Sequence, residues 1–342
     1  MPASMKDVAE AASVSIKTVS NVVNGRPNVG AATRARVLAV MEQLDFRHNP
    51  LAQSLRSGRT GIISVVAPAL DQPYFGSIVN SIIGTASSLG LTVVVELTGG
   101  DPERELAVLN SRRRMTDGTI LIPIGLASTG AGHIDVTYPL VVLGDPIAGS
   151  NAEFVAVQGA EAARAATSML LERGRRRVAA VGVRPDGDDE SRLRGYLSAL
   201  EDHGIPADPA LLVPVKSWHR SAGVEGITAL LDSGAPFDAV FAFNDALALG
   251  VMHGLQARGI TIPDQVAVLG FDDIEEARYT TPSLSSVDPG YAHLARTAVA
   301  RLISLISDEP LSEQPPRTPF RVVERASTGA IPRPRRASDR MD

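Results

Sequence analysis

The order of apolar and polar positions changes character near position 60. Before that point, apolar residues recur at helical spacing in three short stretches, residues 5–12, 16–24 and 31–44. Ser15 is a good N-cap for the second stretch. Because only a tight Ser-Val-Ser turn joins the first two stretches, the pattern predicts a helix-turn-helix, whose second helix enters the major groove of DNA.

The second predicted helix has an unusual polar face. One side repeats apolar residues such as Val19 and Val22, whereas the other lacks the mixed Glu and Lys of an ordinary solvated helix. Short polar donors and a single cation suit the base edges of the major groove, and an apolar side chain suits thymine methyl groups. We therefore expect one face to contact DNA: Ser15, Ile16, Lys17, Ser20 and Asn21.

Beyond position 60, apolar runs alternate with helical stretches. Four strand-like runs, GIISVVAP, LTVVVEL, GTILIPI and PLVVLGD, are followed after about residue 158 by RRVAAVGV, LLVPV, DAVFAFND and QVAVLGFDD. Runs that are apolar at nearly every position indicate strands covered on both faces, hence parallel sheets with helices on each side. The pattern predicts a small all-α headpiece followed by an α/β body of two doubly wound parallel-sheet lobes.

Composition and charge narrow the classes of protein. A chain of 342 residues suits two or three domains, and the absence of cysteine excludes disulfides, thiolate metal sites and cysteine nucleophiles. Residues 1–60 hold eight basic and four acidic side chains, a balance of +4, while the remainder holds 25 and 34, a balance of −9. This asymmetry favours a polyanion partner for the first part, with chance variation as the alternative. No apolar run resembles a signal peptide or a membrane span, so we expect a cytoplasmic protein.

Two stretches carry a family resemblance, MKDVAEAASVSIKTVSNVVNG and TRARVLAVMEQLDFRHNPLAQSLRSGRT. They resemble the headpiece and hinge of the lactose-repressor/galactose-repressor (LacI/GalR) family of bacterial transcription regulators, and the resemblance continues through the body. It implies that Ile16 and Lys17 read bases. It also implies that Thr18 is structural or phosphate-facing, and Arg34 is expected to contact phosphate. Asn21 departs from the family, which usually has Arg there.

The third predicted helix shows a second departure. Gly30 stands where the family usually has a Ser that caps this helix. Glycine in place of serine at an N-cap costs only a few tenths of a kcal/mol.

The stretch NPLAQSLRSG, residues 49–58, predicts a hinge helix. It starts with a cap-plus-proline signal and ends at glycine, but about two turns are too few for a stable isolated helix. The family resemblance implies that the hinge helices of two subunits pair in the minor groove, where Leu55 wedges between central bases. Asn49 and Ala52 belong to the same predicted contact set. The alternative is that Leu51 and Leu55 pack on the headpiece.

A set of polar and aromatic residues lies at or near the carboxyl ends of the predicted strands, where open α/β sheets bind ligands. Carboxylates, an amide and an Arg beside an aromatic face suit a polyhydroxylated ligand such as a sugar. By resemblance, Arg192, Asn244 and Asp272 fall on ligand-contacting positions, whereas the family's usual acidic position aligns with Gly144 better than with Asp145. The predicted ligand-binding residues are Asp71, Tyr74, Phe75, Asp145, Arg192, Trp218, Asn244 and Asp272.

Several of these residues have a structural alternative. Arg192 could pair with a surface carboxylate. Asn244 or Asp245 could only cap the helix that follows. Trp218 could belong to the core of its lobe instead of stacking on a ligand.

Enzyme motifs are absent from the sequence. The chain carries no Gly-rich phosphate loop, nucleophile elbow or HExxH motif, and its six histidines lack metal-ligand spacing. The sequence therefore predicts no enzyme, no metal and no cofactor. A solute-binding protein is one alternative, but it would need an export signal and no helix-turn-helix. A sugar-processing hydrolase is another, and it would turn over a bound sugar.

We therefore predict a ligand-responsive transcription repressor of carbohydrate-use genes. It binds a pseudo-palindromic double-stranded operator at the nucleoid, makes no membrane contact, and is released by a small sugar-like inducer. The predicted parts are a headpiece (1–46), a hinge (47–59), a two-lobed body (60–326) and a disordered tail (327–342). Within the body, the first lobe takes about 60–158 and 289–326, and the second takes 159–288. Because the tail has no leucine heptad, we expect a homodimer and no tetramer.

Overall fold

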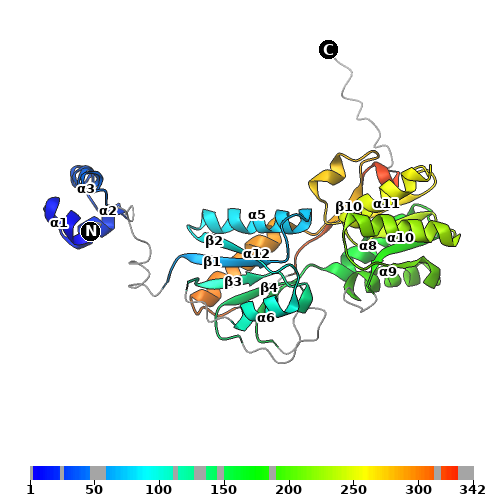
Figure 1. The fold of residues 1–342 in the computed structure, drawn as a ribbon, viewed down its shortest axis with the longest axis horizontal. Coiled ribbons are helices and arrows are strands. Elements are labelled where there is room, and N and C mark those ends of the chain that lie inside the picture. Colours follow the sequence, from blue (N-terminus) through cyan, green and yellow to red (C-terminus); the bar gives the residue numbers. More distant parts are fainter. Residues whose placement is uncertain are drawn as a thin grey trace, which may run out of the picture. The chain divides into compact units, whose positions relative to one another are not determined.

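The chain divides into two compact units, Met1–Thr60 and Gly61–Asp342 (Figure 1). The computed structural model describes residues 3–23, 27–46, 59–110, 115–126, 136–144, 150–184, 190–311 and 317–329. Residues 47–58 of the predicted hinge lie outside the described residues, as do residues 330–342.

The first unit is a three-helix headpiece, α1 (Met5–Ala11), α2 (Ile16–Val23) and α3 (Ala31–Gln43). Its core is small and aliphatic, formed by Val8, Ala9, Ala12, Val19, Val22 and Val37. The predicted cap of α2 is confirmed, because the Thr18 amide donates to Ser15 Oγ at 3.1 Å. In the turn between α1 and α2, Ser13 takes a positive φ of 52°, a conformation that normally favours glycine. The helix-turn-helix prediction is borne out.

The first lobe of the second unit is a five-stranded parallel sheet in the order β2-β1-β3-β4-β5. Its strands are β1 (Ile62–Ala67), β2 (Thr92–Leu97), β3 (Gly118–Leu121), β4 (Leu140–Leu143) and β5 (Glu153–Val155). On one face pack α5 (Pro73–Ser88) and α12 (Tyr291–Ile306), and on the other packs α6 (Pro102–Asn110) (Figure 1). The central strands are buried because helices cover both faces.

The second lobe is a six-stranded sheet in the order β11-β10-β9-β8-β6-β7. Its strands are β6 (Val178–Val183), β7 (Leu212–Pro214), β8 (Ala239–Ala242), β9 (Ala267–Phe271), β10 (Ser285–Asp288) and β11 (Arg321–Val323). One face is covered by α8 (Gly159–Glu172) and α9 (Glu190–Asp202), the other by α10 (Arg220–Ser233) and α11 (Asp245–Ala257) (Figure 1). Short 3₁₀ turns lie at Pro209–Leu211, Glu275–Arg278 and Ala326–Thr328.

Two sequence predictions about the end of the body are wrong. The strand near residue 321 does not return to the first lobe, because β11 pairs antiparallel with β10, matching Val322 with Val287. The first residues of the predicted tail are also ordered in the second lobe. Ser327 is fully buried and its hydroxyl donates to the Val268 carbonyl at 2.6 Å. These hydrogen bonds join residues that are distant in the sequence, so no local sequence pattern predicts them.

The segments that connect the two lobes contact one another near Thr318 and Pro319. Gln158, after β5, donates its side-chain amide to the Thr318 carbonyl at 2.8 Å. Gly290, before α12, has a φ of 76°, and a Cβ there would lie 2.5 Å from the Pro319 carbonyl oxygen. Glycine is therefore required where these connecting segments cross.

None of the helices within the described ranges combines the length and apolar character needed to cross a membrane.

Candidate functional site

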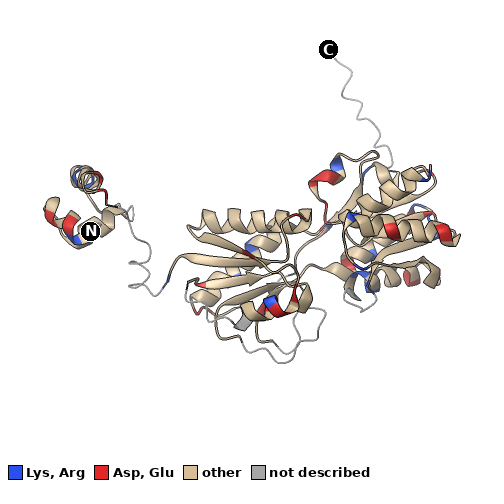
Figure 2. Cartoon of the chain, in the orientation of Figure 1, with Lys and Arg blue, Asp and Glu red and all other residues tan. Residues whose placement is uncertain are grey.

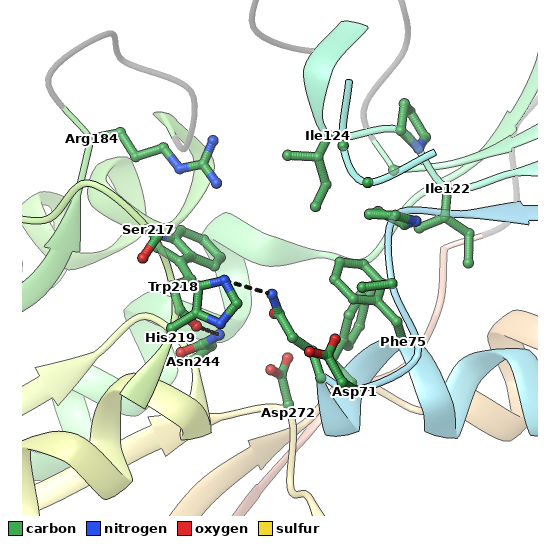
Figure 3. A pocket seen from close by; sticks show the side chains of 18 of the residues that line it. Asp71, Phe75, Ile122, Ile124, Arg184, Ser217, Trp218, His219, Asn244 and Asp272 are labelled. Carbon is green, nitrogen blue, oxygen red and sulfur yellow. Dashed lines mark hydrogen bonds between the residues drawn. The ribbon is translucent and has the colours of Figure 1, made fainter. Parts of the chain in front are cut away.

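A cavity of about 830 Å³ lies between the two lobes of the second unit (Figure 3). It is lined by segments that follow β1, β2, β3 and β4 of the first lobe and β6, β7, β8 and β9 of the second. Ligand sites in doubly wound folds lie at this carboxyl edge of the sheet. Seven of the eight residues predicted from the sequence line the cavity: Asp71, Tyr74, Phe75, Arg192, Trp218, Asn244 and Asp272. The eighth, Asp145, lies outside the described residues.

Arg192 lies in the wall of the cavity and is half-buried. Its guanidinium carbon is 4.7 Å from the centre of the Trp218 ring and 4.0 Å from that of the Phe271 ring. The guanidinium Nη1 donates to the Phe243 carbonyl. Two aromatic faces and a carbonyl hold the planar group in one orientation. The guanidinium is thus fixed against the wall of the cavity.

Asn244 is the N-cap of α11 and also lines the cavity, so the capping alternative and the cavity prediction both describe it. Its Oδ1 accepts from the Leu247 amide at 2.8 Å, and its Nδ2 donates to the Trp218 carbonyl at 3.1 Å. The Trp218 indole N–H donates to the Gly182 carbonyl at 3.0 Å. The ring packs partly on the core of the lobe and partly faces the cavity. These bonds fix the positions of both side chains before any ligand arrives.

Asp272 lies at the end of β9 and is only 3% exposed. Its φ of 119° and the φ of 48° at Asp273 are strained for non-glycine residues. Such strain concentrates at functional positions. Asp273 turns to a different partner, an ion pair with Arg325 at 2.5 Å. The strained pair therefore sends one carboxylate into the cavity and the other into the lobe.

The Asp272 carboxylate contributes to raised pKa values of two neighbouring side chains. Desolvation of the phenol, followed by the Asp272 carboxylate, raises the pKa of Tyr74 to about 12. Burial first, and then the same carboxylate, raises the pKa of Asp245 well above its usual value. Tyr74 therefore stays protonated at neutral pH and keeps its hydroxyl as a hydrogen-bond donor.

Other cavity residues escaped the sequence predictions. Gln72, the N-cap of α5, and His219, the N-cap of α10, meet across the cavity with 3.2 Å between their Nε2 atoms (Figure 3). Arg184 and Lys216 line the second-lobe wall. In the sequence, Arg184 and Lys216 are marked only by their positions just after predicted strands. Many surface residues share such positions.

Glu105 is a further missed residue, and it shapes the first-lobe wall. It is fully buried on α6, and its two carboxylate oxygens accept from the Ile124 amide at 3.0 Å and the Leu126 amide at 2.9 Å. The loop after β3, which carries Ile124 into the cavity, is therefore held by a buried carboxylate.

In the headpiece, the predicted DNA-contacting residues that the structure describes lie outside the buried core. Ser15, Ile16 and Lys17 are exposed, and Thr18, Ser20, Asn21 and Arg34 are half-buried. Ile16 is 40% exposed, as a contact to a thymine methyl group requires. Charges of both signs are scattered over the body (Figure 2), whereas Lys17 is the only charged residue of α2. Asn49, Ala52 and Leu55 lie outside the described residues.

No group of three or more His, Cys, Asp or Glu residues that could hold a metal ion occurs within the described ranges. A helix-turn-helix unit joined to a two-lobed body with a polar cavity defines a class, the ligand-responsive transcription regulators.

Comparison with known proteins identifies the family within this class. Residues 4–49 match the pattern of bacterial regulatory proteins of the lacI family, and residues 167–328 match the periplasmic binding protein-like domain. A LacI-family regulator structure from Sanguibacter keddieii is 42% identical, covering 80% of this chain and all of the other, with a TM-score of 0.73. The chain belongs to the LacI family of bacterial transcription regulators, and it is not an enzyme.

Two other matches extend over both units of the chain. The ribose operon repressor of Halalkalibacterium halodurans is 30% identical, covering 95% of this chain and 96% of the other. The structure of the lac repressor dimer bound to operator and an anti-inducer is 25% identical, covering 96% of this chain and 99% of the other, with a TM-score of 0.78.

Proposed function

We propose that this protein is a homodimeric repressor of carbohydrate-use genes whose operator affinity is lowered by a sugar bound between the lobes. It acts in the cytoplasm at the nucleoid, on a pseudo-palindromic operator. The observation that carries the proposal is the cavity itself, in which Arg192, Asn244 and Asp272 of one lobe face Tyr74 and Phe75 of the other. Fixed polar groups beside aromatic rings are typical of sites for polyhydroxylated ligands.

The relatives support the same function. One is a ribose operon repressor, and another is a lac repressor crystallised as a dimer on its operator. A dimer with two helix-turn-helix units presents two recognition helices to two half-sites, so a pseudo-palindromic operator follows from its symmetry.

Coupling between sugar and DNA needs a difference between two arrangements of the lobes. A ligand that touches both lobes favours the closed arrangement only through contacts it makes better there. Closure would move the first lobe, which the chain enters through β1 directly after the hinge segment. We infer that this movement prevents the short hinge segments of two subunits from pairing, with a coupling of about 1–3 kcal/mol.

The test uses the full-length protein and an operator obtained by selection from random duplexes. Operator binding is titrated with and without a sugar that raises the melting temperature, since a ligand that binds the folded state stabilises it. Arg192→Ala and Asp272→Ala should abolish the sugar response. A full response in both variants would exclude the cavity, and tighter operator binding with sugar would reverse the sign.

A further inference from the structure

The turn that follows β9 presents Asp272 to the cavity in a strained backbone conformation. Asp272 has a φ of 119° and Asp273 has a φ of 48°, and Asp272 lines the cavity. Residues other than glycine adopt such angles only at a cost in conformational energy, and they keep them only where the surrounding contacts enforce them. The position of the Asp272 carboxylate therefore depends on the groups that hold this turn.

Three consecutive backbone amides of the turn donate to acceptors on neighbouring elements. The Asp272 amide donates to a backbone carbonyl of β10 at 2.8 Å. The Asp273 amide donates to the hydroxyl of Ser286 at 3.0 Å. The Ile274 amide donates to Asp245 Oδ2 at 2.9 Å. Two side chains, from β10 and from α11, thus hold the second and third amides of the turn.

These two side chains form one buried unit. Ser286 and Asp245 are both fully buried, and the Ser286 hydroxyl donates to Asp245 Oδ1 at 2.6 Å. The unit lies against β9 at Gly270, where a Cβ would lie only 2.1 Å from Asp245 Oδ1. A side chain at position 270 would therefore displace the carboxyl group that holds the turn.

Asp245 also connects the turn to a second residue of the cavity. It directly follows Asn244, which caps α11 and lines the cavity. Asn244 and Asp272 follow β8 and β9, which are neighbours in the sheet. A single buried carboxyl group thus joins the backbone beside Asn244 to the backbone beside Asp272. Neither Asp245 nor Ser286 belongs to the lining of the cavity.

The turn is held on its other side by an ion pair. The Asp273 carboxylate accepts from the Arg325 guanidinium at 2.5 Å, and both side chains are largely buried. The same guanidinium donates to the Leu284 carbonyl at 2.7 Å, which fixes it to the segment before β10. Side chains from two directions therefore keep the backbone of the turn in its strained form.

We propose that Asp245 and Ser286 are positioning residues of the sugar site, which raise the affinity for sugar by holding the Asp272 carboxylate in place. A group that is fixed before the ligand arrives loses less conformational freedom on binding than a group on a loose turn. This inference rests on the proposed function, because it concerns the affinity of the same sugar site.

The experiment measures Kd by calorimetry on the full-length protein. The fluorescence of Trp218, the single tryptophan of the sequence and a residue of the cavity wall, gives a second readout. The probes are ribose, glucose, galactose and cellobiose, and the sugar that binds the wild type most tightly is used with every variant. Ser286→Ala removes one hydroxyl with little change in volume. It should weaken sugar binding by about tenfold.

Ser327→Ala is the matched control. Ser327 is also fully buried in the second lobe, where its hydroxyl donates to the Val268 carbonyl at 2.6 Å and accepts from the Ser285 amide at 2.8 Å. It therefore loses one donated and one accepted hydrogen bond, as Ser286→Ala does. The two variants should lower the melting temperature to a similar extent. Ser327→Ala should change the sugar Kd by less than about twofold.

A double-mutant cycle separates positioning from a general loss of stability. In an Asp272→Asn background the carboxylate is already absent, so Ser286→Ala should weaken sugar binding by less than about twofold. Asp245→Asn is a second variant for the same cycle. It keeps an acceptor for the Ile274 amide but alters the bond to Ser286. It should weaken binding by about threefold in the wild type and have no effect in the Asp272→Asn background.

Two results would overturn the positioning role and leave the proposed function intact. One is an equal loss of sugar affinity from Ser286→Ala and Ser327→Ala. The other is a loss from Ser286→Ala or Asp245→Asn that is as large in the Asp272→Asn background as in the wild type. If none of the four sugars binds the wild type, the proposed sugar response fails, and this inference fails with it.

Discussion

Lys17 and Ile16 are exposed in the first turn of α2, while Val19 and Val22 of the same helix are buried in the headpiece core. If Lys17 contacts base edges, Lys17→Ala should weaken specific operator binding by about 1–3 kcal/mol and relax the preference at one operator position. Arg34→Ala, which would remove a phosphate contact, should weaken binding to all sequences alike. Fluorescence anisotropy on operator and random duplexes measures both. Equal losses of Lys17→Ala on the two duplexes would remove Lys17 from the base-reading set.

The buried carboxyl group of Asp245 makes the stability of the fold depend on pH. Its carboxylate is fully buried and accepts from the Ile274 amide at 2.9 Å and the Ser286 hydroxyl at 2.6 Å. Burial, and then the Asp272 charge, raises its pKa well above the usual value. An acid whose pKa is raised by folding stabilises the protein fully below its unfolded pKa, about 4, and this stability is lost as pH rises toward the folded pKa.

Asp245→Asn imitates the protonated acid and should remove this dependence. Asn can accept from the Ile274 amide and donate to Ser286, so the fold is retained. The difference in melting temperature, variant minus wild type, should become more positive as pH rises from about 4 to 8. A difference between the two proteins that stays constant over this range would contradict the prediction.

At the scale of elements, the start of α3 is under-stabilised. Gly30 is its N-cap with a φ of −59° and a ψ of 148°, and no side chain caps the helix. A Cβ at Gly30 would meet no heavy atom within 4 Å. Gly30→Ser should therefore stabilise the headpiece by about 0.5–1 kcal/mol, because it adds a cap and lowers the entropy of the unfolded chain.

A second glycine gives a control of opposite sign. Gly90, after α5, also has open space around a Cβ, but its φ is 77°. Gly90→Ser should destabilise the body by about 1 kcal/mol, because a serine is strained in the left-handed region. Differential scanning calorimetry of the full chain measures both variants. Gly30→Ser with no effect, or a loss, would show that the cap position is limited by another contact.

At the scale of the whole body, the side chains of Gln72 and His219 form a hydrogen bond that joins the lobes across the cavity. Gln72 of the first lobe and His219 of the second are 3.2 Å apart at their Nε2 atoms. Gln72→Ala should weaken sugar binding about two- to tenfold, because a bond of about 0.5–1.5 kcal/mol no longer supports the arrangement in which both lobes face the ligand.

The control is Gln256→Ala, which removes a bond within one lobe. Gln256 donates to the Thr281 carbonyl at 2.7 Å, away from the cavity. It should leave sugar affinity unchanged in the same calorimetric titration. Equal effects of the two variants would show that the loss at Gln72 is a general loss of stability.

Most of the elements, and the class of fold, can be predicted from the sequence alone. Apolar periodicity locates the three headpiece helices, and runs such as 62–67 and 239–242 mark buried parallel strands because both faces of such strands are covered. The same pattern misses β10, whose Ser285 and Ser286 are polar yet fully buried. Those serines bond to Arg325, to Thr328 of the final 3₁₀ turn and to Asp245, which are far away in the chain.

Seven cavity residues could be predicted because strand ends of a parallel sheet converge on one edge, a rule that needs no coordinates. The neighbours of these residues across the cavity depend on the tertiary fold. The order β9-β8-β6-β7 differs from the order along the chain. Asp272, Asn244, Arg184 and Lys216, which follow these strands, are therefore neighbours along the cavity wall only in the folded sheet. The Gln72–His219 contact likewise joins residues 147 positions apart. Periodicity reports the burial of a side chain, whereas neighbours across a cavity are set by the path of the whole chain.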